Sequence, residues 1–309
     1  MDKLSVKANA KINLTLNITG RLPNGYHSLR SIMQSISLHD VVTVEKTDSA
    51  EIEVICGGGI PSGEQNIAYK AAREFFRFAD IADKGVRISI EKHIPSEAGL
   101  GGGSADAAAV ICCLDTLFCC DFSQEALCEI GASVGADVPF CIIGGTALCE
   151  GIGEVITPLL PLECECVLIA KGKLGVSTKE AYAKLDSTEI QYSPWEVSDF
   201  SGGFESWARL CSNDFEAVSG NTEVEALISE MKSSGVSLSQ MSGSGSAVFG
   251  LFSDRKNAES CRKKLSELGF FAEICEFAEK GIDTNFKSTY KQFINYNGFN
   301  PHQIPLQGA

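Results

Sequence analysis

A glycine-rich stretch, followed directly by a helical pattern, is the part of the sequence best suited to chemistry. Gly99, Gly101, Gly102 and Gly103 lie close together before an alanine-rich run. Backbone N–H groups at a helix N-terminus and the positive end of the helix dipole attract anions. Because glycine has no side chain, a phosphate can approach the backbone closely. The stretch therefore predicts a phosphate-binding loop.

This loop differs from the two commonest nucleotide-binding motifs. A Walker loop ends in Gly-Lys-Ser/Thr, and no lysine follows Gly103. A dinucleotide fold needs G-x-G-x-x-G and a second parallel strand. Here Asp106 takes the place of the third glycine, and 123–134 has a helical pattern. A glycine-rich turn without a ligand is the other alternative, and the cost of ordering four clustered glycines disfavours it.

Polar residues near the N-terminus alternate with apolar ones. Over 10–19, Ile12 and Leu14 lie on one strand face, whereas Lys11 and Asn13 project side by side from the other. A solvent-exposed polar face is the commoner meaning of such alternation. A lysine beside an amide could instead serve a reaction.

Three further positions could contribute to a site. Tyr26 and His27 follow a predicted turn, where they could hold a flat ring or simply lie on the surface. A tight turn at 135–139 presents the carboxylate of Asp137. A second glycine cluster at 241–246 again offers backbone amides with little steric bulk.

Hydrophobic periodicity predicts the elements that position these residues. We expect strands and helices in the following ranges: strands at 10–19, 41–45, 51–56, 86–91, 146–150, 154–156, 167–170, 247–252 and 270–277, and helices at 67–78, 107–117, 123–134, 223–233 and 255–268. Asn66 is expected to cap the helix at 67–78, and Thr178 a short helix in the second half. This mixture indicates an α+β fold.

Two prolines and a change of pattern predict a domain boundary in 158–165. The first domain then covers 1–160, the second 161–278, and a tail 279–309. Aromatic residues at helix spacing in the tail favour a short helix docked on the second domain, with a partner surface or a disordered tail as alternatives.

Composition limits the function further. The net charge is −14 and the pI about 4.8, which disfavours nucleic acid and acidic membranes as partners. The 13 cysteines form no C-x-x-C motif and the four histidines lie far apart, so we expect free thiols and no protein metal site. No secretory signal or membrane-spanning run is recognisable, and a soluble cytoplasmic protein is expected.

Three blocks, at 10–14, 95–109 and 243–245, resemble in order and spacing the three motifs of the GHMP kinases, the superfamily of galactokinase, homoserine kinase, mevalonate kinase and phosphomevalonate kinase. Within it, 11–14, 24–27 and 135–139 are similar to the group with a cytidyl substrate. The resemblance covers roughly 5–277. It implies a two-domain fold with the active site in the cleft between the domains. The first domain would hold a mixed sheet with a left-handed βαβ unit, opposite to the usual hand, and the second a ferredoxin-like α/β sandwich.

The resemblance also implies an activity. The ATP γ-phosphoryl group would pass to the 2-hydroxyl of 4-diphosphocytidyl-2-C-methyl-D-erythritol, giving the 2-phosphate and ADP in non-mevalonate isoprenoid biosynthesis. Mg²⁺ would be bound mostly through phosphates and water. The alternatives are a homoserine or mevalonate type of GHMP kinase and a catalytically inactive nucleotide-binding protein. A monomer or weak dimer is expected.

Residue roles follow from the same resemblance. Asp137 would accept the hydroxyl proton, while Lys11 would keep that carboxylate ionised and stabilise negative charge. Tyr26 and Tyr182 would sandwich the cytosine and His27 would meet its edge. The implied ATP-binding residues are Pro95, Gly99, Leu100, Gly101, Gly102, Gly103, Ser104 and, on the adenine side, Asn66; the implied substrate-binding residues are Asn13, Tyr26, His27, Thr178, Tyr182, Ser242, Gly243 and Ser244.

Two stretches depart from the family pattern. Ser96 and Glu97 replace small or apolar residues, and the charge of Glu97 beside the phosphates is expected to raise KM for ATP. At 171–173 the family often has a proline that this chain lacks, so the resemblance does not define the course of the chain from there to Thr178.

Overall fold

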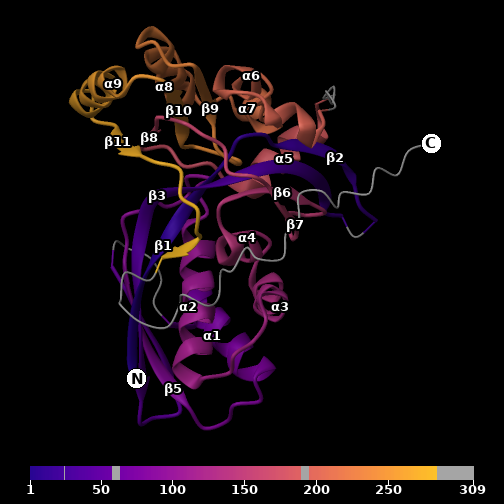
Figure 1. Ribbon diagram of the computed structural model, residues 1–309, viewed down its shortest axis with the longest axis vertical. Helices are drawn as coiled ribbons and strands as arrows, with labels where there is room; N and C mark the ends of the chain where they lie inside the picture. The colour runs from indigo at the N-terminus through magenta and orange to yellow at the C-terminus, as the bar shows by residue number, and fades with distance from the viewer. Residues whose placement is uncertain (24, 58–62, 189–194, 284–309) are drawn as a thin grey trace.

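One long strand, β3 (His27–Thr47), runs through the whole of the first sheet. The structure is a computed structural model that describes residues 1–23, 25–57, 63–188 and 195–283. In Figure 1 the first sheet lies below the second, and the helices α1 to α4 cover one face of it.

The first sheet has the order β12-β1-β3-β5-β4; β2 and β6 pair with the first part of β3, and β7 pairs with β6. Its other strands are β1 (Lys3–Asn13), β2 (Asn17–Arg21), β4 (Ile52–Cys56), β5 (Gly85–Glu91), β6 (Thr146–Glu150), β7 (Val155–Pro158) and β12 (Ile282–Asp283). β4 and β5 are parallel and α1 lies between them in the chain, as expected for a βαβ unit. The predicted left hand of this crossover stays a prediction.

The second sheet is antiparallel throughout, in the order β11-β8-β10-β9. Its strands are β8 (Cys166–Lys171), β9 (Leu238–Met241), β10 (Val248–Phe252) and β11 (Phe271–Cys275). Helices precede β9 and separate β10 from β11, which gives the predicted ferredoxin-like arrangement of an α/β sandwich. The expected α+β fold is confirmed.

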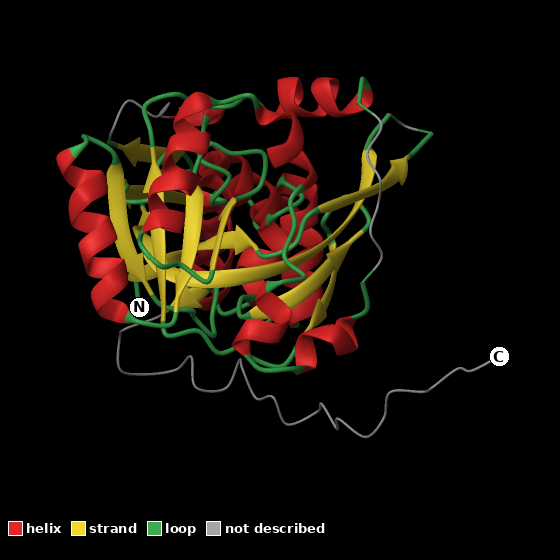
Figure 2. Ribbon diagram, turned by 90° about the horizontal axis from the view of Figure 1, so that it is seen from above, coloured by secondary structure: helices red, strands yellow, loops and turns green. Residues whose placement is uncertain are grey.

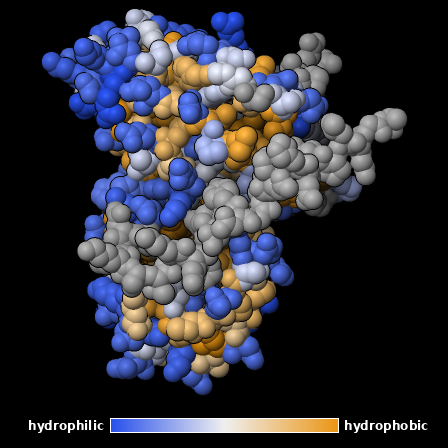
Figure 3. Space-filling view, in the orientation of Figure 1, coloured by the Kyte–Doolittle hydropathy of each residue, from blue (hydrophilic) through white to orange (hydrophobic). Residues whose placement is uncertain are grey.

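The helices divide between the two sheets. They are α1 (Ile67–Phe78), α2 (Gly102–Phe118), α3 (Gln124–Val134), α4 (Val138–Ile143), α5 (Thr178–Asp186), α6 (Phe204–Ala208), α7 (Asp214–Ser219), α8 (Thr222–Ser233) and α9 (Arg255–Glu267), with 3-10 turns η1 (Gly63–Gln65) and η2 (Val197–Ser201). Hydrophilic side chains gather over α9 in Figure 3. In the described ranges, every helix is too short or too polar to cross a bilayer.

Side-chain alternation along β8 joins two cores. Val167 and Ile169 belong to the large core between the first sheet and α1 to α4. Cys166, Leu168 and Ala170 belong to a second core with α8 and α9. Successive strand residues face opposite sides of a sheet, so one strand packs against both domains.

Several predicted boundaries differ from the observed ones. The strand predicted at 10–19 is broken, because β1 ends at Asn13 and β2 begins at Asn17. The predicted strand at 41–45 is only the last part of β3, and the turn at 135–139 leads directly into α4. The cap of α5 is Ser177, whose hydroxyl accepts a hydrogen bond from the N–H of Glu180, and Thr178 is the first helical residue.

The end of the described chain returns to the first sheet. β12 pairs with β1, and the N–H of Ala278 donates to the carbonyl of Ser35. The side chain of Asn9 donates to the carbonyl of Lys280 at 2.8 Å. Residues 278–283 therefore contact the first domain. The helix predicted in the tail lies outside the described residues.

Candidate active site

The glycine loop lies against β1. Gly101 precedes α2 with a φ of 70°, a left-handed conformation that favours glycine. The carbonyl of Leu100 accepts a hydrogen bond from the N–H of Lys11 at 3.0 Å. A methyl group on Gly101 would lie 2.8 Å from Cγ of Lys11, so the loop needs glycine here.

Lys11 is buried and has two polar partners. Its Nζ donates to Oδ1 of Asn13 at 2.6 Å and lies 3.3 Å from Oδ2 of Asp137. Lys11 is only 4% exposed, and a buried charge of this kind requires pairing. A register shift between Asn9 and Lys11 in the β1–β3 ladder locally redirects the strand at this point.

Asp137 stands at the N-cap of α4 without capping it through its side chain. The carboxylate is 30% exposed and reaches Lys11 instead. The predicted neighbourhood of Lys11, Asn13 and Asp137 is therefore present. The alternative of a solvent-exposed polar face over 10–19 does not hold, since Lys11, Asn13 and Thr15 are all buried.

The second glycine cluster touches the first. The hydroxyl of Ser242 donates to the carbonyl of Gly99 at 2.9 Å, and the N–H of Ala247 donates to the carbonyl of Ala98 at 3.0 Å. Asn213 fixes this second loop by donating to the carbonyl of Gly243 at 2.8 Å. The glycine loop of the first domain is thus bordered by the second glycine cluster, which belongs to the second domain.

A pocket of about 600 Å³ opens beside the glycine loop. Its lining is Gln65, Asn66, Ile67, Lys92, Ile94, Pro95, Ser96, Glu97, Ala98, Gly99, Leu100, Gly101, Gly102, Gly103, Ser104 and Asp106. This set includes every residue predicted to bind ATP. Asn66 also caps α1, because its Oδ1 accepts a hydrogen bond from the N–H of Ala68.

A buried charge cluster, which includes two of the residues that line the pocket, was missed by sequence reasoning. Lys92 Nζ bonds the carboxylate of Asp40 and lies 2.7 Å from Oδ2 of Asp106. Asp40 also accepts hydrogen bonds from the N–H groups of His93 and Ile94. Burial raises the pKa of Asp106 to about 7, against the effect of Lys92. A single carboxylate at the start of an alanine-rich helix was the available sign.

The predicted cytosine residues lie where β2 and β3 meet α5. The imidazole of His27 stacks on Tyr182 with ring centroids 4.7 Å apart and an interplanar angle of 18°. His27 Nε2 is 2.6 Å from Oδ1 of Asp186, a partner that sequence reasoning missed. Tyr26 is 60% exposed. His27 therefore lies face to face with Tyr182, and not at the edge of a ring stacked there.

Two observations link this region to Asp137 and the glycine loops. Burial raises the pKa of Tyr182, and the charge of Asp137 raises it further. The hydroxyls of Thr178 and Ser244 are 2.9 Å apart. The arm formed by β2 and the start of β3 extends sideways from the first sheet in both views (Figures 1 and 2). Tyr182 is thus linked to Asp137, and Thr178 to the second glycine cluster.

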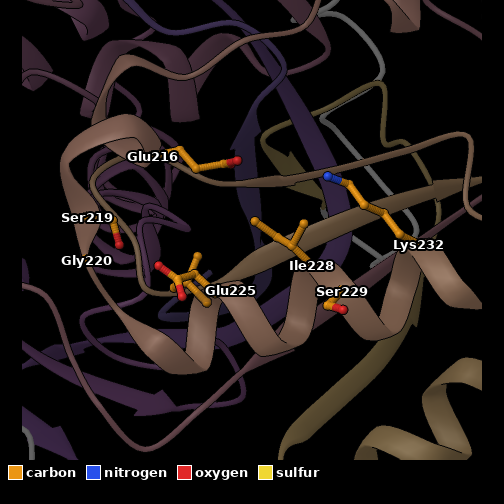
Figure 4. Close-up of a pocket in the computed structure, with 8 residues that line it drawn as sticks. Glu216, Ser219, Gly220, Glu225, Ile228, Ser229 and Lys232 are labelled. Atoms are coloured by element: carbon orange, nitrogen blue, oxygen red, sulfur yellow. The ribbon is translucent and has the colours of Figure 1, made fainter.

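Another pocket, of about 420 Å³, lies between α7 and α8 (Figure 4). Glu216, Glu225, Ile228 and Lys232 line it. The carboxylate of Glu216 already accepts a hydrogen bond from the N–H of Met241 at 2.7 Å. None of the predicted site residues lines this pocket, so the glycine-loop pocket is the better candidate.

Comparison with protein families gives two matches. The model "GHMP kinases N terminal domain" matches residues 66–145, which contain the glycine loop and Asp137. The model "GHMP kinases C terminal" matches residues 200–269, which contain the second glycine cluster.

Individual relatives share most of their length with this chain. A 4-diphosphocytidyl-2-C-methyl-D-erythritol kinase of Clostridium botulinum is 40% identical over 271 residues, covering 85% of this chain and 96% of the relative. The Clostridium perfringens protein of that name is 41% identical over 265 residues, covering 83% and 91%.

Solved structures agree in fold. A crystal structure of 4-(cytidine 5'-diphospho)-2C-methyl-D-erythritol kinase has a TM-score of 0.71 and 31% identity, covering 88% of this chain and 99% of that one. The homoserine kinase of Cytophaga hutchinsonii has a TM-score of 0.70 at 17% identity, covering 92% and 97%. The second likeness concerns the fold alone.

Proposed function

We propose that Lys11 and Asp137 carry out the phosphoryl transfer of this chain, which belongs to the GHMP kinases and among them to the 4-diphosphocytidyl-2-C-methyl-D-erythritol kinases. The chain is an ATP-dependent kinase that phosphorylates the 2-hydroxyl of 4-diphosphocytidyl-2-C-methyl-D-erythritol in isoprenoid biosynthesis. The observation that supports the residue roles is the 3.3 Å approach of Lys11 Nζ to Asp137 beside the glycine loop.

The chemistry requires few covalent steps from the protein. Phosphoryl transfer passes through a loose transition state, so positioning and charge neutralisation dominate catalysis. The 2-hydroxyl oxygen forms a bond to the γ-phosphorus while the bond from that phosphorus to ADP breaks. Asp137 takes the hydroxyl proton, and the ammonium of Lys11, 3.3 Å from Oδ2 of Asp137, stabilises the negative charge that develops during transfer. Asn13 orients Lys11 through their 2.6 Å hydrogen bond.

The pocket suits a nucleoside triphosphate. Its volume of about 600 Å³ lies within the ordinary range for small-molecule sites. The free N–H groups at the start of α2 and the helix dipole would hold the phosphates. Asn66 lies on the adenine side, and Ser242, Gly243 and Ser244 border the cradle from the second domain.

We place Mg²⁺ on the phosphates of bound ATP. In the ranges that the structure describes, no group of three His, Cys, Asp or Glu side chains could hold a metal ion. Mg²⁺ commonly keeps several waters and binds substrate phosphates with few protein ligands, which fits this pocket. The ion would neutralise phosphate charge, while residues 99–104 hold the phosphates that carry it.

The cytidine end would lie beside the stack of His27 and Tyr182. Tyr26 would cover the base from the arm, and Thr178 and Ser244 would contact the linking phosphates or sugar. The homoserine and mevalonate alternatives are not favoured, because those solved structures are only 17% and 14% identical and share the fold alone. We also propose a monomer or weak dimer in the cytoplasm that binds neither nucleic acid nor membranes.

A coupled ADP-release assay tests the function. We expect turnover with 4-diphosphocytidyl-2-C-methyl-D-erythritol and none above background with homoserine or mevalonate. Comparable kcat/KM on homoserine or mevalonate would contradict the substrate assignment while leaving the kinase fold intact.

A further inference from the structure

Asp186 joins the arm to α5 at the proposed cytosine site. Its Oδ1 lies 2.6 Å from His27 Nε2, and its Oδ2 lies 3.7 Å from a guanidinium nitrogen of Arg21. His27 and Arg21 are paired residues of β3 and β2. One carboxylate therefore contacts both strands of the arm.

The position of Asp186 in its helix is unfavourable without these partners. It is the last residue of α5, where the helix dipole repels negative charge. The hydrogen bond from His27 is the main cause that lowers the pKa of Asp186, followed by the charges of His27 and Arg21. The contact with His27 thus offsets the helix-end repulsion.

The imidazole of His27 is held in two directions. Stacking on Tyr182 fixes the plane of the ring, and Tyr182 is itself fixed by an edge contact with Phe215. The bond to Asp186 fixes the rotation of the ring in that plane. Among the described residues, no protein group forms a hydrogen bond with His27 Nδ1. This nitrogen is the polar atom left for a ligand.

The partner of Nε2 decides the chemistry of Nδ1. An ionised carboxylate only accepts hydrogen bonds, so Nε2 carries the hydrogen in their contact. In neutral imidazole, Nδ1 is then a lone-pair acceptor. Cytosine presents a 4-amino donor at the position where uracil presents a carbonyl acceptor. An acceptor at Nδ1 matches the first base and opposes the second.

We propose that Asp186 is a positioning residue that holds His27 with Nδ1 as an acceptor and so selects cytidine over uridine substrates. The proposal rests on the proposed function, because it takes the cytidyl group to lie at His27. Asp186 acts through His27 and not by touching the reacting phosphate.

Asp186→Asn is the direct test. The side-chain amide can turn its NH₂ group toward Nε2, which allows the tautomer with hydrogen on Nδ1. We expect the ratio of kcat/KM for 4-diphosphocytidyl-2-C-methyl-D-erythritol to that for its uridine analogue to fall on the order of tenfold or more. KM for ATP should stay within about twofold, since the ATP pocket is separate. Glu180→Gln, an exposed carboxylate on the same helix, is the matched control and should keep the wild-type ratio.

A double variant shows whether Asp186 acts through His27. In His27→Ala the ratio should already be lost, and adding Asp186→Asn should change it no further. Additive losses would overturn the proposal. An unchanged ratio in Asp186→Asn, or the absence of a cytidine preference in the wild type, would overturn it too. If the wild type does not phosphorylate the cytidyl substrate at all, the proposed function itself fails.

A spectroscopic measurement does not depend on the variant folding. Nitrogen-15 NMR of histidine-labelled wild-type protein at about pH 8 reports which ring nitrogen carries hydrogen, and with four histidines in the chain His27→Ala identifies the resonance. We expect the hydrogen on Nε2 of His27. Hydrogen on Nδ1 in the free protein would overturn the proposal.

Discussion

Lys11 and Asp137 show how burial makes a pair of side chains useful. Lys11 is nearly fully buried, whereas Asp137 is partly exposed and stays accessible to a substrate hydroxyl. The ammonium therefore acts where water screens it little, and the carboxylate remains able to accept a proton. Neither residue alone would combine these properties.

Removing the charge of Asp137 should lower the rate of phosphoryl transfer while leaving ATP binding nearly unchanged. We expect Asp137→Asn to lower kcat by about a hundred- to ten-thousand-fold, as for the loss of a general base, with little change in ATP affinity. Steady-state kinetics and nucleotide titration measure both. Normal turnover would remove Asp137 from the mechanism.

Asp106 should make stability depend on pH. Its pKa in the fold is raised from 3.8 to about 7, mainly by burial. A carboxyl of this kind favours folding when it is protonated. Its contribution to the free energy of unfolding is therefore fully present below its unfolded pKa and is lost as pH rises toward about 7. Asp106→Asn is neutral throughout and should escape this loss.

Urea unfolding between about pH 4 and pH 8 measures the difference. The free energy of unfolding of Asp106→Asn relative to wild type should rise by up to about 1.4 kcal/mol per pH unit inside that window and level off above it. Any constant offset from the altered contact with Lys92 does not affect this slope. Parallel curves for the two proteins would contradict the assignment.

At the scale of elements, the glycine loop and β1 depend on each other. Gly101 has a left-handed φ, and a methyl group there would meet the side chain of Lys11. The loop therefore can carry no side chain at this position without displacing Lys11, the amine that we propose to be catalytic. The conformation of the loop at Gly101 and the placement of the Lys11 amine therefore depend on each other.

Gly101→Ala should destabilise the fold by about 1–3 kcal/mol and lower kcat, because strain and the displaced Lys11 add together. Gly220→Ala is the matched control, since Gly220 also has a left-handed φ but no atom within 4 Å of its added methyl. Thermal unfolding of both variants isolates the contribution of the clash. Equal losses would mean that contact with Lys11 is unimportant.

Local patterns predicted some elements well and others poorly. α1 and α3 are preceded by Asn66 and Ser123, whose side chains cap helices with recognisable apolar spacing. α4 has only six residues, too few for a periodic pattern. β3 was predicted only at its end, because its first part is buried by elements distant in sequence, as with Trp195 against Arg30.

Some residues of the candidate site could likewise be predicted from the sequence, and others could not. Glycine spacing predicted the loop, and the family resemblance predicted Lys11 with Asp137. Within the cluster of Asp40, Lys92 and Asp106, Lys92 lies 52 positions from Asp40 and 14 from Asp106, so no local pattern contains it. Asp186 lies 159 positions from His27 and could be recognised only in the fold.

At the scale of the whole molecule, the last described strand completes the first sheet. Gly281 accepts a hydrogen bond from the N–H of Asn9, and a methyl group on Gly281 would lie 1.8 Å from the carbonyl of Cys141. Residues 276–283, which follow β11, therefore support both β1 and α4. Through these elements they also support Lys11 and Asp137.

A chain that stops after Cys275 should lose this support. Without residues 276–283 the buried Asn9 loses its partners, and each unsatisfied polar group costs about 1–3 kcal/mol. We expect a clearly lower melting temperature and reduced kcat. A chain that stops after Asp283 is the control, and equal melting temperatures for the two would contradict the expectation.

The contact of Ser242 with Gly99 has a consequence for biosynthesis. The two residues are 143 positions apart, and ribosomes add roughly 5–20 residues per second, so on the order of ten seconds separates their emergence. During that interval a nascent chain carries the first half of the ATP cradle without its second wall. A growing polypeptide therefore has to pass Ser242 before the glycine loop has both of its walls and nucleotide can be consumed.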